Sequence, residues 1–496
     1  MTDGMATLVD LHRRIVQLRK AVLRDGEAIL RLWRPAIADQ AFLAAATNLA
    51  HYLALRRHDL SEMQTVLASC GLTSLGRSEA HVQTTLDALE ATLTRLAGLG
   101  TPNYPDPARM IEGTLALRRQ TNLIFGRAGD DGSTQIMATL PTEAGTDAAL
   151  VGRIVAAGMN CARINCAHDS APTWAAMIAN VRTAATAAGS DCRILMDLGG
   201  AKCRIATFHA ADKLRLKRGD RFVLVRSMAD ATASDLVIAS ISFPAILDCL
   251  KPGAEVWIND GKLGSRVTAV APGRVELEVI SARGKGERLR PEKGVNFPST
   301  ELALDPLTPK DLQDLDFVAA HADLVGFSFV QRPSDITRLQ AELTSRRPGR
   351  PLQPIMLKIE TQLAVQNLPR LIVQAGGSHP VAVMIARGDL AVELGFGRMS
   401  EMQEEILWLC EAAHVPVVWA TQVLEGLVRD GSPSRAEATD AAMGQRAECI
   451  MLNKGPFLAE AITFLRDVLR RMDRHHRKNS ARLGPLQSWR LRNLAL

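Results

Sequence analysis

The sequence lacks long apolar runs, paired cysteines and a strong charge of one sign. No uninterrupted apolar stretch approaches the length of a membrane span, and the N-terminus has acidic residues early and no apolar signal core. The eight cysteines include no Cys-x-x-Cys pair, which indicates buried thiols in a reducing, cytoplasmic compartment. A net charge of +6 over 496 residues weakly favours anionic ligands and does not argue for nucleic acid.

The chain does have an apolar content of 47% and enough length for two or three domains with their own cores. Residues 1–125 are predicted to be entirely helical, because apolar residues recur at helical spacing, for example from Leu8 to Leu18. The proline-rich segment 98–105 is the best linker candidate. We expect this helical region to be a cap, a dimerisation module or a binding module.

From residue 135 onward, short apolar strands alternate with helical stretches. Eight strands are expected, at residues 135–140, 159–165, 193–198, 322–329, 354–360, 381–387, 416–422 and 448–453. The alternation predicts a parallel sheet, and eight units predict a closed (β/α)8 barrel of the TIM type. Chemistry in that fold gathers at the C-terminal ends of the strands. The polar residues at these ends are Asn165, Asp197, Glu360, Asp389 and Thr421.

A long segment between the third and fourth expected strands interrupts this pattern. Arg221–Val225 has strand character, and Trp257–Gly261 contains an Asp-Gly turn signal. The segment is therefore predicted to be a small inserted β-domain that acts as a lid above the barrel. We expect a helical N-terminal domain (1–125), a barrel (126–204 and 293–475), the inserted domain (205–292) and a basic tail (476–496).

Two strand ends carry the charges of a candidate metal site. Lys358 and Glu360 are two residues apart on one strand and therefore point to the same face. Asp389 follows the next apolar run, and on a neighbouring parallel strand about 4.8 Å away it would meet Glu360 at one hard cation. Magnesium takes one or two carboxylates and leaves its other positions to water and phosphate. The pattern predicts a phosphate or enolate site.

Seven short strings in the same region resemble the pyruvate kinase family, and they occur in the family's order. They are Gly158–Asn165 followed by His168, Ile258–Gly261, Lys293–Asn296, Lys358–Glu360, Ala386–Leu390, Ala420–Glu425 and Ser434–Glu437. The family fold also has a β/α barrel with a β-domain inserted after the third strand. The resemblance implies magnesium-dependent phosphoryl transfer from phosphoenolpyruvate to ADP, giving pyruvate and ATP.

The resemblance also implies roles for individual residues. Lys358 would lie against the transferring phosphoryl group, and Thr421 would lie on the face where the enolate is protonated. Glu360 and Asp389 would hold Mg²⁺, or Mn²⁺ in its place. The remaining implied contacts are Arg163 and Arg204 to phosphate, and His168 and Lys293 to the nucleotide. This much positive charge suits two polyanionic substrates, since phosphoryl transfer is catalysed mainly by positioning and charge neutralisation.

The potassium site of the family is altered in this sequence. Leu198 and Ala167 replace two hydroxyl residues, and Lys202 stands where the family usually has glutamate. An ammonium group can supply the same fixed positive charge, so we predict a potassium-independent site with Lys202 as its internal cation. We count Lys202 with the retained Asn165 and Asp197 among the cofactor-binding residues.

The nucleotide side departs further from the family. The first strand end has no arginine, Gly199 and Ala201 replace a lysine and a proline, and Asn453–Gly455 replaces Ser-Gly-Glu. Few residues follow the last expected barrel helix, so the family's C-terminal regulatory domain is not expected. Three hypotheses stay open: a divergent pyruvate kinase, a magnesium–enolate lyase or decarboxylase on a 2-oxo acid, and a non-catalytic phosphoenolpyruvate sensor. We expect a homo-oligomer without membrane or nucleic-acid partners.

Overall fold

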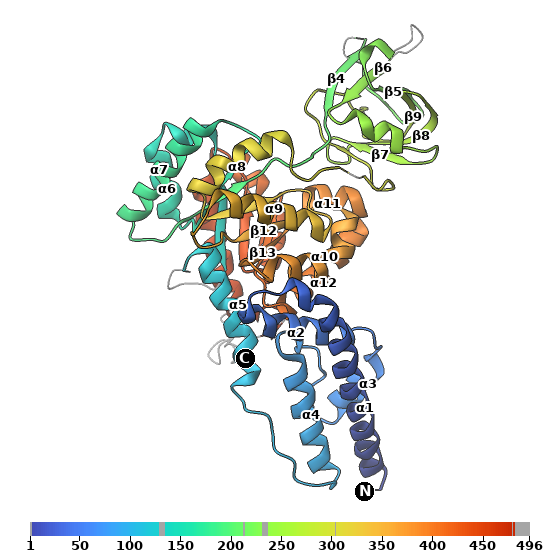
Figure 1. The fold of residues 1–496 in the computed structure, drawn as a ribbon, viewed down its shortest axis with the longest axis vertical. Coiled ribbons are helices and arrows are strands. Elements are labelled where there is room, and N and C mark those ends of the chain that lie inside the picture. Colours follow the sequence, from blue (N-terminus) through green and yellow to red (C-terminus); the bar gives the residue numbers. More distant parts are fainter. Residues whose placement is uncertain are drawn as a thin grey trace, which may run out of the picture.

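The computed structural model describes residues 2–127, 134–211, 214–230, 237–302, 304–478 and 480–481. It has a helical N-terminal region, a central barrel and a small β-domain that stands clear of the barrel at the opposite end (Figure 1). Within those ranges, no helix combines the length and apolar character needed to cross a membrane.

The N-terminal region is helical across its described residues, as predicted. Its helices are α1 (Thr2–Trp33), α2 (Gln40–Leu55), α3 (Ser61–Ser69), α4 (Val82–Leu96) and α5 (Arg109–Phe125), with 3₁₀ turns η1 (Arg34–Ala36) and η2 (Glu79–His81). Helix α1 packs against α2 and α4 through a fully apolar stripe that includes Leu11 and Ile15. The predicted linker 98–105 joins α4 to α5, so it lies inside the helical region.

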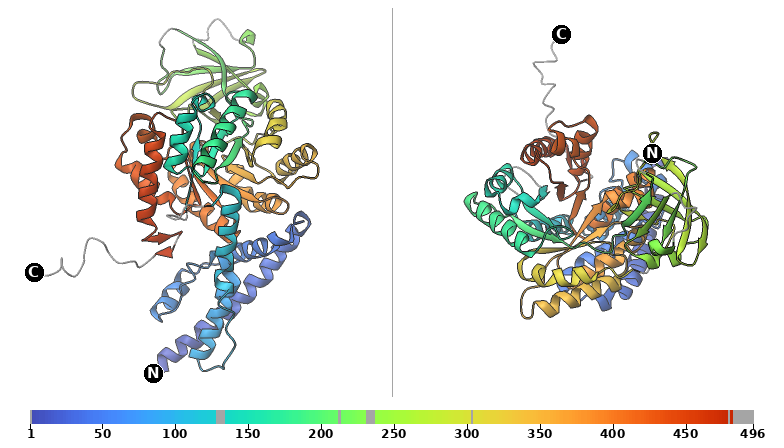
Figure 2. Two further views of the ribbon diagram at one scale, coloured as in Figure 1. Left: turned by 90° about the vertical axis from the view of Figure 1, so that its left-hand side faces the viewer. Right: turned by 90° about the horizontal axis from the view of Figure 1, so that it is seen from above.

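Helix α5 reaches the floor of the barrel. Its last residues, Ile124 and Phe125, are 1% and 0% exposed and pack among inward-facing strand residues such as Met137 and Met384. Figure 2 shows α5 running from the helical region up to the barrel. The boundary that we propose at residue 125 therefore falls at the end of a helix that both parts share.

The eight predicted strands form a closed parallel barrel in the order β1-β15-β14-β13-β12-β11-β3-β2. Their bounds are β1 Gln135–Thr139, β2 Cys161–Asn165, β3 Arg193–Asp197, β11 Leu324–Phe327, β12 Ile355–Ile359, β13 Val381–Ala386, β14 Val417–Ala420 and β15 Cys449–Leu452. Strands β12 and β13 are neighbours with Ile359 opposite Ile385, which confirms the adjacency on which the predicted metal site depends.

Helices cover the outside of the barrel. They are α6 Ala148–Ala157, α7 Ala171–Ala187, α8 Pro309–His321, α9 Pro333–Arg346, α10 Gln362–Gly376, α11 Arg387–Leu394, α12 Phe396–Ala412, α13 Glu425–Asp430, α14 Arg435–Gly444 and α15 Leu458–Met472, with η3 at Thr142–Gly145. The last turn of α15 carries Arg470 and Arg471, as expected for a helix C-terminus. A short hairpin follows, β16 (His476–Arg477) and β17 (Ser480–Ala481). Residues 482–496 of the predicted basic tail lie outside the described residues.

The inserted β-domain follows β3, as predicted, and is a seven-stranded sheet in the order β10-β7-β8-β9-β5-β6-β4. Its elements are β4 Ile205–Ala210, β5 Arg221–Val225, η4 Met228–Asp230, β6 Val237–Ile241, η5 Pro244–Cys249, β7 Glu255–Ile258, β8 Leu263–Ala271, β9 Arg274–Ala282 and β10 Val295–Asn296. The predicted turn joins β7 to β8, with Asn259 and Asp260 at φ 57° and 54°. Because β10 pairs with β7, the sheet continues past the expected boundary at residue 292.

Candidate functional site

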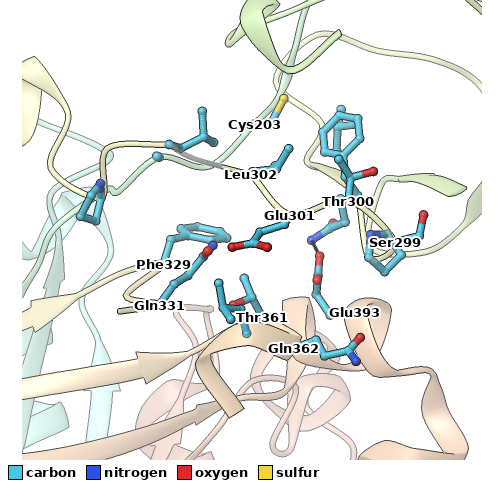
Figure 3. A pocket seen from close by; sticks show the side chains of 18 of the residues that line it. Cys203, Ser299, Thr300, Glu301, Leu302, Phe329, Gln331, Thr361, Gln362 and Glu393 are labelled. Atoms are coloured by element: carbon cyan, nitrogen blue, oxygen red, sulfur yellow. Dashed lines mark hydrogen bonds between the residues drawn. The ribbon is translucent and has the colours of Figure 1, made fainter. Parts of the chain in front are cut away.

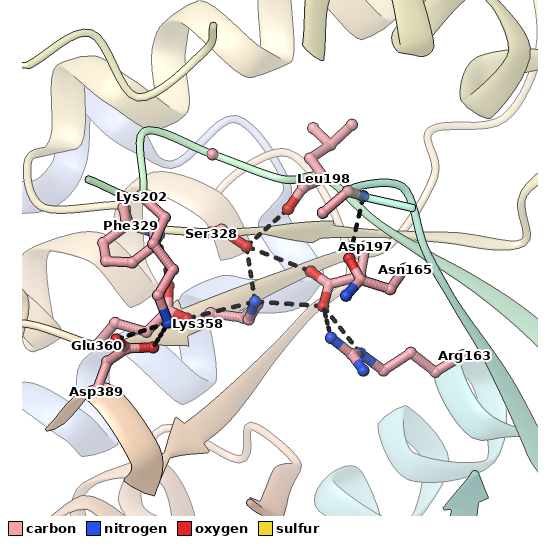
Figure 4. A network of polar contacts seen from close by, with 12 residues as sticks. Arg163, Asn165, Asp197, Leu198, Lys202, Ser328, Phe329, Lys358, Glu360 and Asp389 are labelled. Atoms are coloured by element: carbon pink, nitrogen blue, oxygen red, sulfur yellow. Dashed lines mark hydrogen bonds and ion pairs between the residues drawn. The ribbon is translucent and has the colours of Figure 1, made fainter. Parts of the chain in front are cut away.

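The carboxylate of Asp197 is the centre of a polar cluster at the C-terminal ends of β2, β3, β11 and β12 (Figure 4). Its Oδ2 accepts hydrogen bonds from Arg163 Nε and Nη2 at 2.9 and 2.6 Å, and Lys358 Nζ lies 3.2 Å away. The neighbouring strand leaves room for this group, because a Cβ at Gly326 would lie 2.6 Å from Asp197 Oδ1. Asp197 is 1% exposed, so its two cations compensate a fully buried charge.

Lys358 is held by groups from three strand ends. Its Nζ donates to Ser328 Oγ at 2.6 Å, and it lies 3.4 Å from Glu360 Oε1 in addition to its contact with Asp197. The Ser328 hydroxyl donates to the Leu198 carbonyl at 2.7 Å. The other oxygen of Glu360, Oε2, accepts the backbone N–H of Phe329 at 2.7 Å. The prediction that Lys358 and Glu360 face the same side of β12 is therefore confirmed.

Burial and charge compete in setting the protonation of this cluster. Burial alone would raise the pKa of Asp197, but Lys358 and Arg163 outweigh it and hold that pKa below its usual value. Burial likewise opposes the charge of Lys358, and the carboxylates of Asp197 and Glu360 raise its pKa above the usual value. Burial, followed by repulsion from Asp389, raises the pKa of Glu360. The cluster thus keeps the ammonium of Lys358 between the carboxyl groups of Asp197 and Glu360.

Asp389 lies in the first turn of α11, and Lys202 reaches it from the segment after β3. Lys202 Nζ is 2.9 Å from each oxygen of the Asp389 carboxylate. The ammonium predicted as an internal cation therefore contacts the predicted metal ligand, whereas Asp197 is bonded by Arg163, Lys358 and Ser328. The positive charge of Lys202 also lowers the pKa of Glu360, against the larger effect of burial, which raises it.

Glu360 and Asp389 together fit a hard divalent cation. Both are carboxylates at adjacent strand ends, and Mg²⁺ needs only one or two such groups when water and phosphate complete its shell. Across the described ranges, no set of three or more His, Cys, Asp or Glu side chains is arranged to hold a metal ion. Two carboxylates leave the other positions of such a cation to water and phosphate.

The backbone of Thr421 is held by Arg387, which lies two residues before Asp389 in the string Ala386–Leu390. Arg387 donates to the carbonyls of Ala420 and Thr421 at 2.8 Å each, forms an ion pair with Asp440 and covers the Trp419 ring at 4.5 Å. Thr421 has a left-handed backbone conformation, with φ 73°. The arginine contacts stabilise this conformation, and the Thr421 side chain lies against Gly388, one residue before Asp389, with its methyl group nearest.

Within the described ranges, the other predicted residues make their contacts outside the Asp197 cluster. Asn165 lies opposite Asp197 on β2, but its Oδ1 accepts the N–H of Ala167 at 3.1 Å. Arg204 lies at the base of the inserted domain and donates to the Glu292 carbonyl at 2.9 Å. His168 follows β2, and burial, then Lys454 and Arg204, lower its pKa. Lys293 contributes its backbone carbonyl to Ile205 within the described structure.

A cavity of about 430 Å³ lies beside this site, between the inserted domain and the barrel rim. Figure 3 shows Phe329, Thr361 and Glu393 around it, together with Cys203 and Glu301. Burial raises the pKa of Glu393 to about 7. This carboxyl group lies one turn beyond Asp389 on α11 and accepts Asn296 Nδ2 of β10 at 3.4 Å. It is therefore a titratable contact between the inserted domain and the barrel.

Three of the side chains that build this site were not among the predicted site residues. Ser328, Arg387 and Asp440 hold Lys358 and the backbone of Thr421. Arg387 stands inside the string Ala386–Leu390, so a charged residue next to a candidate ligand was an available signal. Asp440 lies beyond the string Ser434–Glu437, and Ser328 is a single hydroxyl after a strand without a recognisable pattern.

Comparison with known proteins agrees with this arrangement. The family profile "Pyruvate kinase, barrel domain" matches residues 132–460. A pyruvate kinase of Methylorubrum extorquens is 34% identical over 348 residues, which is 69% of this chain and 69% of that protein. A pyruvate kinase of Clostridium acetobutylicum is 32% identical over 321 residues, which is 63% of this chain and 65% of that protein. One of Thermococcus litoralis is 28% identical over 363 residues, which is 72% of each chain. The chain belongs to the pyruvate kinase barrel-domain family.

Proposed function

We propose that the protein transfers the phosphoryl group of phosphoenolpyruvate to ADP and releases pyruvate and ATP. The observation that carries this proposal is the position of Lys358, which Ser328 and Asp197 hold beside Glu360, next to Asp389. An ammonium beside two carboxylates at a barrel mouth suits a reaction in which negative charge moves between two phosphate-bearing substrates.

Glu360 and Asp389 are the residues that would hold Mg²⁺ or Mn²⁺. Such a cation, when bound, neutralises phosphate and enolate oxygens. In this proposal Lys358 donates hydrogen bonds to the phosphoryl group as the bond to the enol oxygen breaks and a phosphate oxygen of ADP takes its place. Arg163 adds a second cation, and its two hydrogen bonds from Nε and Nη2 to Asp197 Oδ2 fix its direction.

Thr421 is proposed to lie on the side from which the enolate carbon receives its proton. Its backbone is held by Arg387, and its side chain lies against Gly388, the residue before Asp389. Arg204, His168 and Lys293 are proposed to contact the phosphates and the nucleotide. Arg204 and Lys293 lie at the base of the inserted domain, so closure of that domain would move them towards the substrates. His168 follows β2 on the barrel itself.

The site is also proposed to work without potassium, with Asn165, Asp197 and Lys202 as its local polar set. The support is that the ammonium of Lys202 stands within the charged cluster as a permanent cation. We further propose a cytoplasmic homo-oligomer that uses phosphoenolpyruvate and ADP or ATP and has no nucleic-acid partner, as the family resemblance implies.

A coupled pyruvate-release assay tests the main proposal. We expect turnover with phosphoenolpyruvate, ADP and magnesium, with or without potassium, and none in the Asp389→Ala variant. The altered residues Gly199 and Ala201 on the nucleotide side are the reason to run two further arms. Turnover of oxaloacetate without nucleotide would identify a lyase or decarboxylase. Binding of phosphoenolpyruvate without turnover in any arm would identify a sensor.

A further inference from the structure

Lys202 connects the inserted domain to the barrel through its side chain. It lies in the segment 198–204 between β3 and β4, two residues before Arg204, which forms a β-bridge with Gly294 at the base of the domain. The aliphatic part of Lys202 crosses Gly294 closely, because a Cβ at that glycine would lie 3.0 Å from Lys202 Cε. The side chain is thus held at the base of the domain before it reaches the barrel.

The far end of the same side chain is bound to the barrel rim. Lys202 Nζ lies 2.9 Å from both oxygens of Asp389, and the two side chains are 23% and 13% exposed. Figure 4 shows the ammonium lying against Asp389 close to Glu360. A second contact joins the same two parts, because Asn296 of β10 donates to Glu393 one turn further along α11. Helix α11 therefore receives both polar contacts from the base of the inserted domain.

An ammonium and a divalent cation cannot both be bound closely by one carboxylate without strong repulsion. Both oxygens of Asp389 already lie at hydrogen-bond distance from Lys202. A cation coordinated by Asp389 and Glu360 would bring two positive charges within about 4 Å of the ammonium, where repulsion in a partly buried site amounts to several kcal/mol. Both oxygens of Asp389 are engaged by one ammonium, so a cation bound there competes with the contact between Lys202 and Asp389.

We propose that Lys202 is a positioning residue that competes with the divalent cation for Asp389, and that its release passes cation binding on to the inserted domain. The inference rests on the proposed function only in taking Glu360 and Asp389 as the cation ligands. Because coupling between two equilibria is reciprocal, contacts that keep Lys202 on Asp389 weaken cation binding, and the cation weakens the connection between the domain and α11.

The first test measures metal binding alone. Free Mn²⁺ is followed by electron paramagnetic resonance during titration of the full-length protein, without substrate or nucleotide. Lys202→Met should bind Mn²⁺ about tenfold more tightly than the wild type, the factor that corresponds to removal of one charge-assisted competing contact. Lys217→Met, which removes an exposed lysine of the inserted domain, should leave the affinity unchanged.

Lys202→Met removes a positive charge as well as the contact with Asp389, so a second variant disturbs the contact and keeps the charge. In Gly294→Ala the added methyl group would press on Lys202 Cε, so Mn²⁺ binding should tighten while the lysine remains. Equal or weaker binding in Lys202→Met would overturn the inference and leave the kinase proposal standing. Failure of every variant to bind Mn²⁺ would instead overturn both the inference and the assignment of Glu360 and Asp389 as ligands.

The effect on the inserted domain is measured with the natural cysteines. Cys249 in that domain and Cys70 at the end of α3 are exposed, and the other six cysteines are buried, so both can be labelled with fluorophores. Addition of Mg²⁺ should change energy transfer between them in the wild type. Lys202→Met should show the changed value before Mg²⁺ is added. The Mg²⁺ concentration is set to one that fully displaces bound Mn²⁺ from the wild type. Energy transfer in the wild type that does not change at this concentration would show that the cation does not act on the domain.

Discussion

Lys358 and Ser328 are joined across neighbouring strand ends by a 2.6 Å hydrogen bond from the ammonium to the hydroxyl oxygen. The shorter contact of the hydroxyl hydrogen is with the Leu198 carbonyl at 2.7 Å, and Asp197 Oδ1 is a second acceptor at 3.4 Å, so in either orientation Ser328 presents a lone pair to the lysine. This hydroxyl therefore makes the shortest of the three contacts that orient the ammonium between Asp197 and Glu360.

Removal of that hydroxyl should slow turnover without unfolding the protein. Ser328→Ala deletes one hydrogen bond to a charged group, so we expect kcat to fall about tenfold. Ser334→Ala, at an exposed position on α9, is the matched control and should keep full activity. An unchanged kcat in Ser328→Ala would show that Asp197 and Glu360 suffice to orient Lys358.

Loss of the ammonium itself should separate binding from chemistry. Lys358→Met removes a preorganised donor to the transferring group, and we expect kcat to fall about a thousandfold. Arg163 stays paired with Asp197 in this variant, so phosphoenolpyruvate should still raise the melting temperature in the presence of magnesium. Turnover close to the wild-type rate would remove Lys358 from the chemistry altogether.

The potassium prediction is tested by reversal of charge at Lys202. Lys202→Glu places a carboxylate beside Asp389 and Glu360, so turnover should come to depend on added potassium. The assay compares potassium chloride with tetramethylammonium chloride at equal ionic strength. Lys217→Glu carries the same change of charge on the exposed surface of the inserted domain and should stay independent of potassium. Activity of Lys202→Glu that is equal in both salts would refute the prediction.

Glu393 should make stability depend on pH. Burial raises its folded pKa from 4.5 to about 7, so the folded protein binds this proton more tightly than the unfolded chain does. Its contribution to the free energy of unfolding is therefore present at low pH and is lost as the pH rises from about 4.5 towards 7. Glu393→Gln should gain about 2 kcal/mol relative to the wild type at pH 8 and little at pH 4.

Urea unfolding at the two pH values measures this difference. Glu401→Gln, at an exposed position on α12, should show the same pH dependence as the wild type. A wild type and a Glu393→Gln variant that change in parallel with pH would mean that Glu393 ionises normally, with water reaching it from the adjoining cavity.

The barrel and its insertion could be predicted because both depend on local patterns. Strands alternate with helices, and the order of the strands around a parallel barrel follows the order of the chain. The pairing of β12 with β13, and with it the shared neighbourhood of Glu360 and Asp389, follows from that order. The residue types at the strand ends then indicate the class of chemistry.

The contacts that the sequence did not reveal join segments far apart in the chain. Lys202 meets Asp389 across 187 residues, and Asn48 of the helical region donates to the Ala412 carbonyl across 364 residues. Neither contact is encoded by spacing, since each depends on how a loop or helix docks on the finished barrel. For the same reason, the sequence could not show whether Lys202 would lie beside the potassium-site residues or, as the structure has it, against Asp389.

Phe125 makes the helical region part of the barrel's own assembly. The ring fills the floor among residues from the barrel strands, so a chain that starts after residue 125 would keep its strands and lose a packed layer beneath them. Loss of a buried aromatic ring of this kind costs about 3–5 kcal/mol. The helical region is therefore a poor place to divide the gene for expression of the catalytic part alone. During synthesis, the residue that seals the barrel leaves the ribosome before any strand that it must seal.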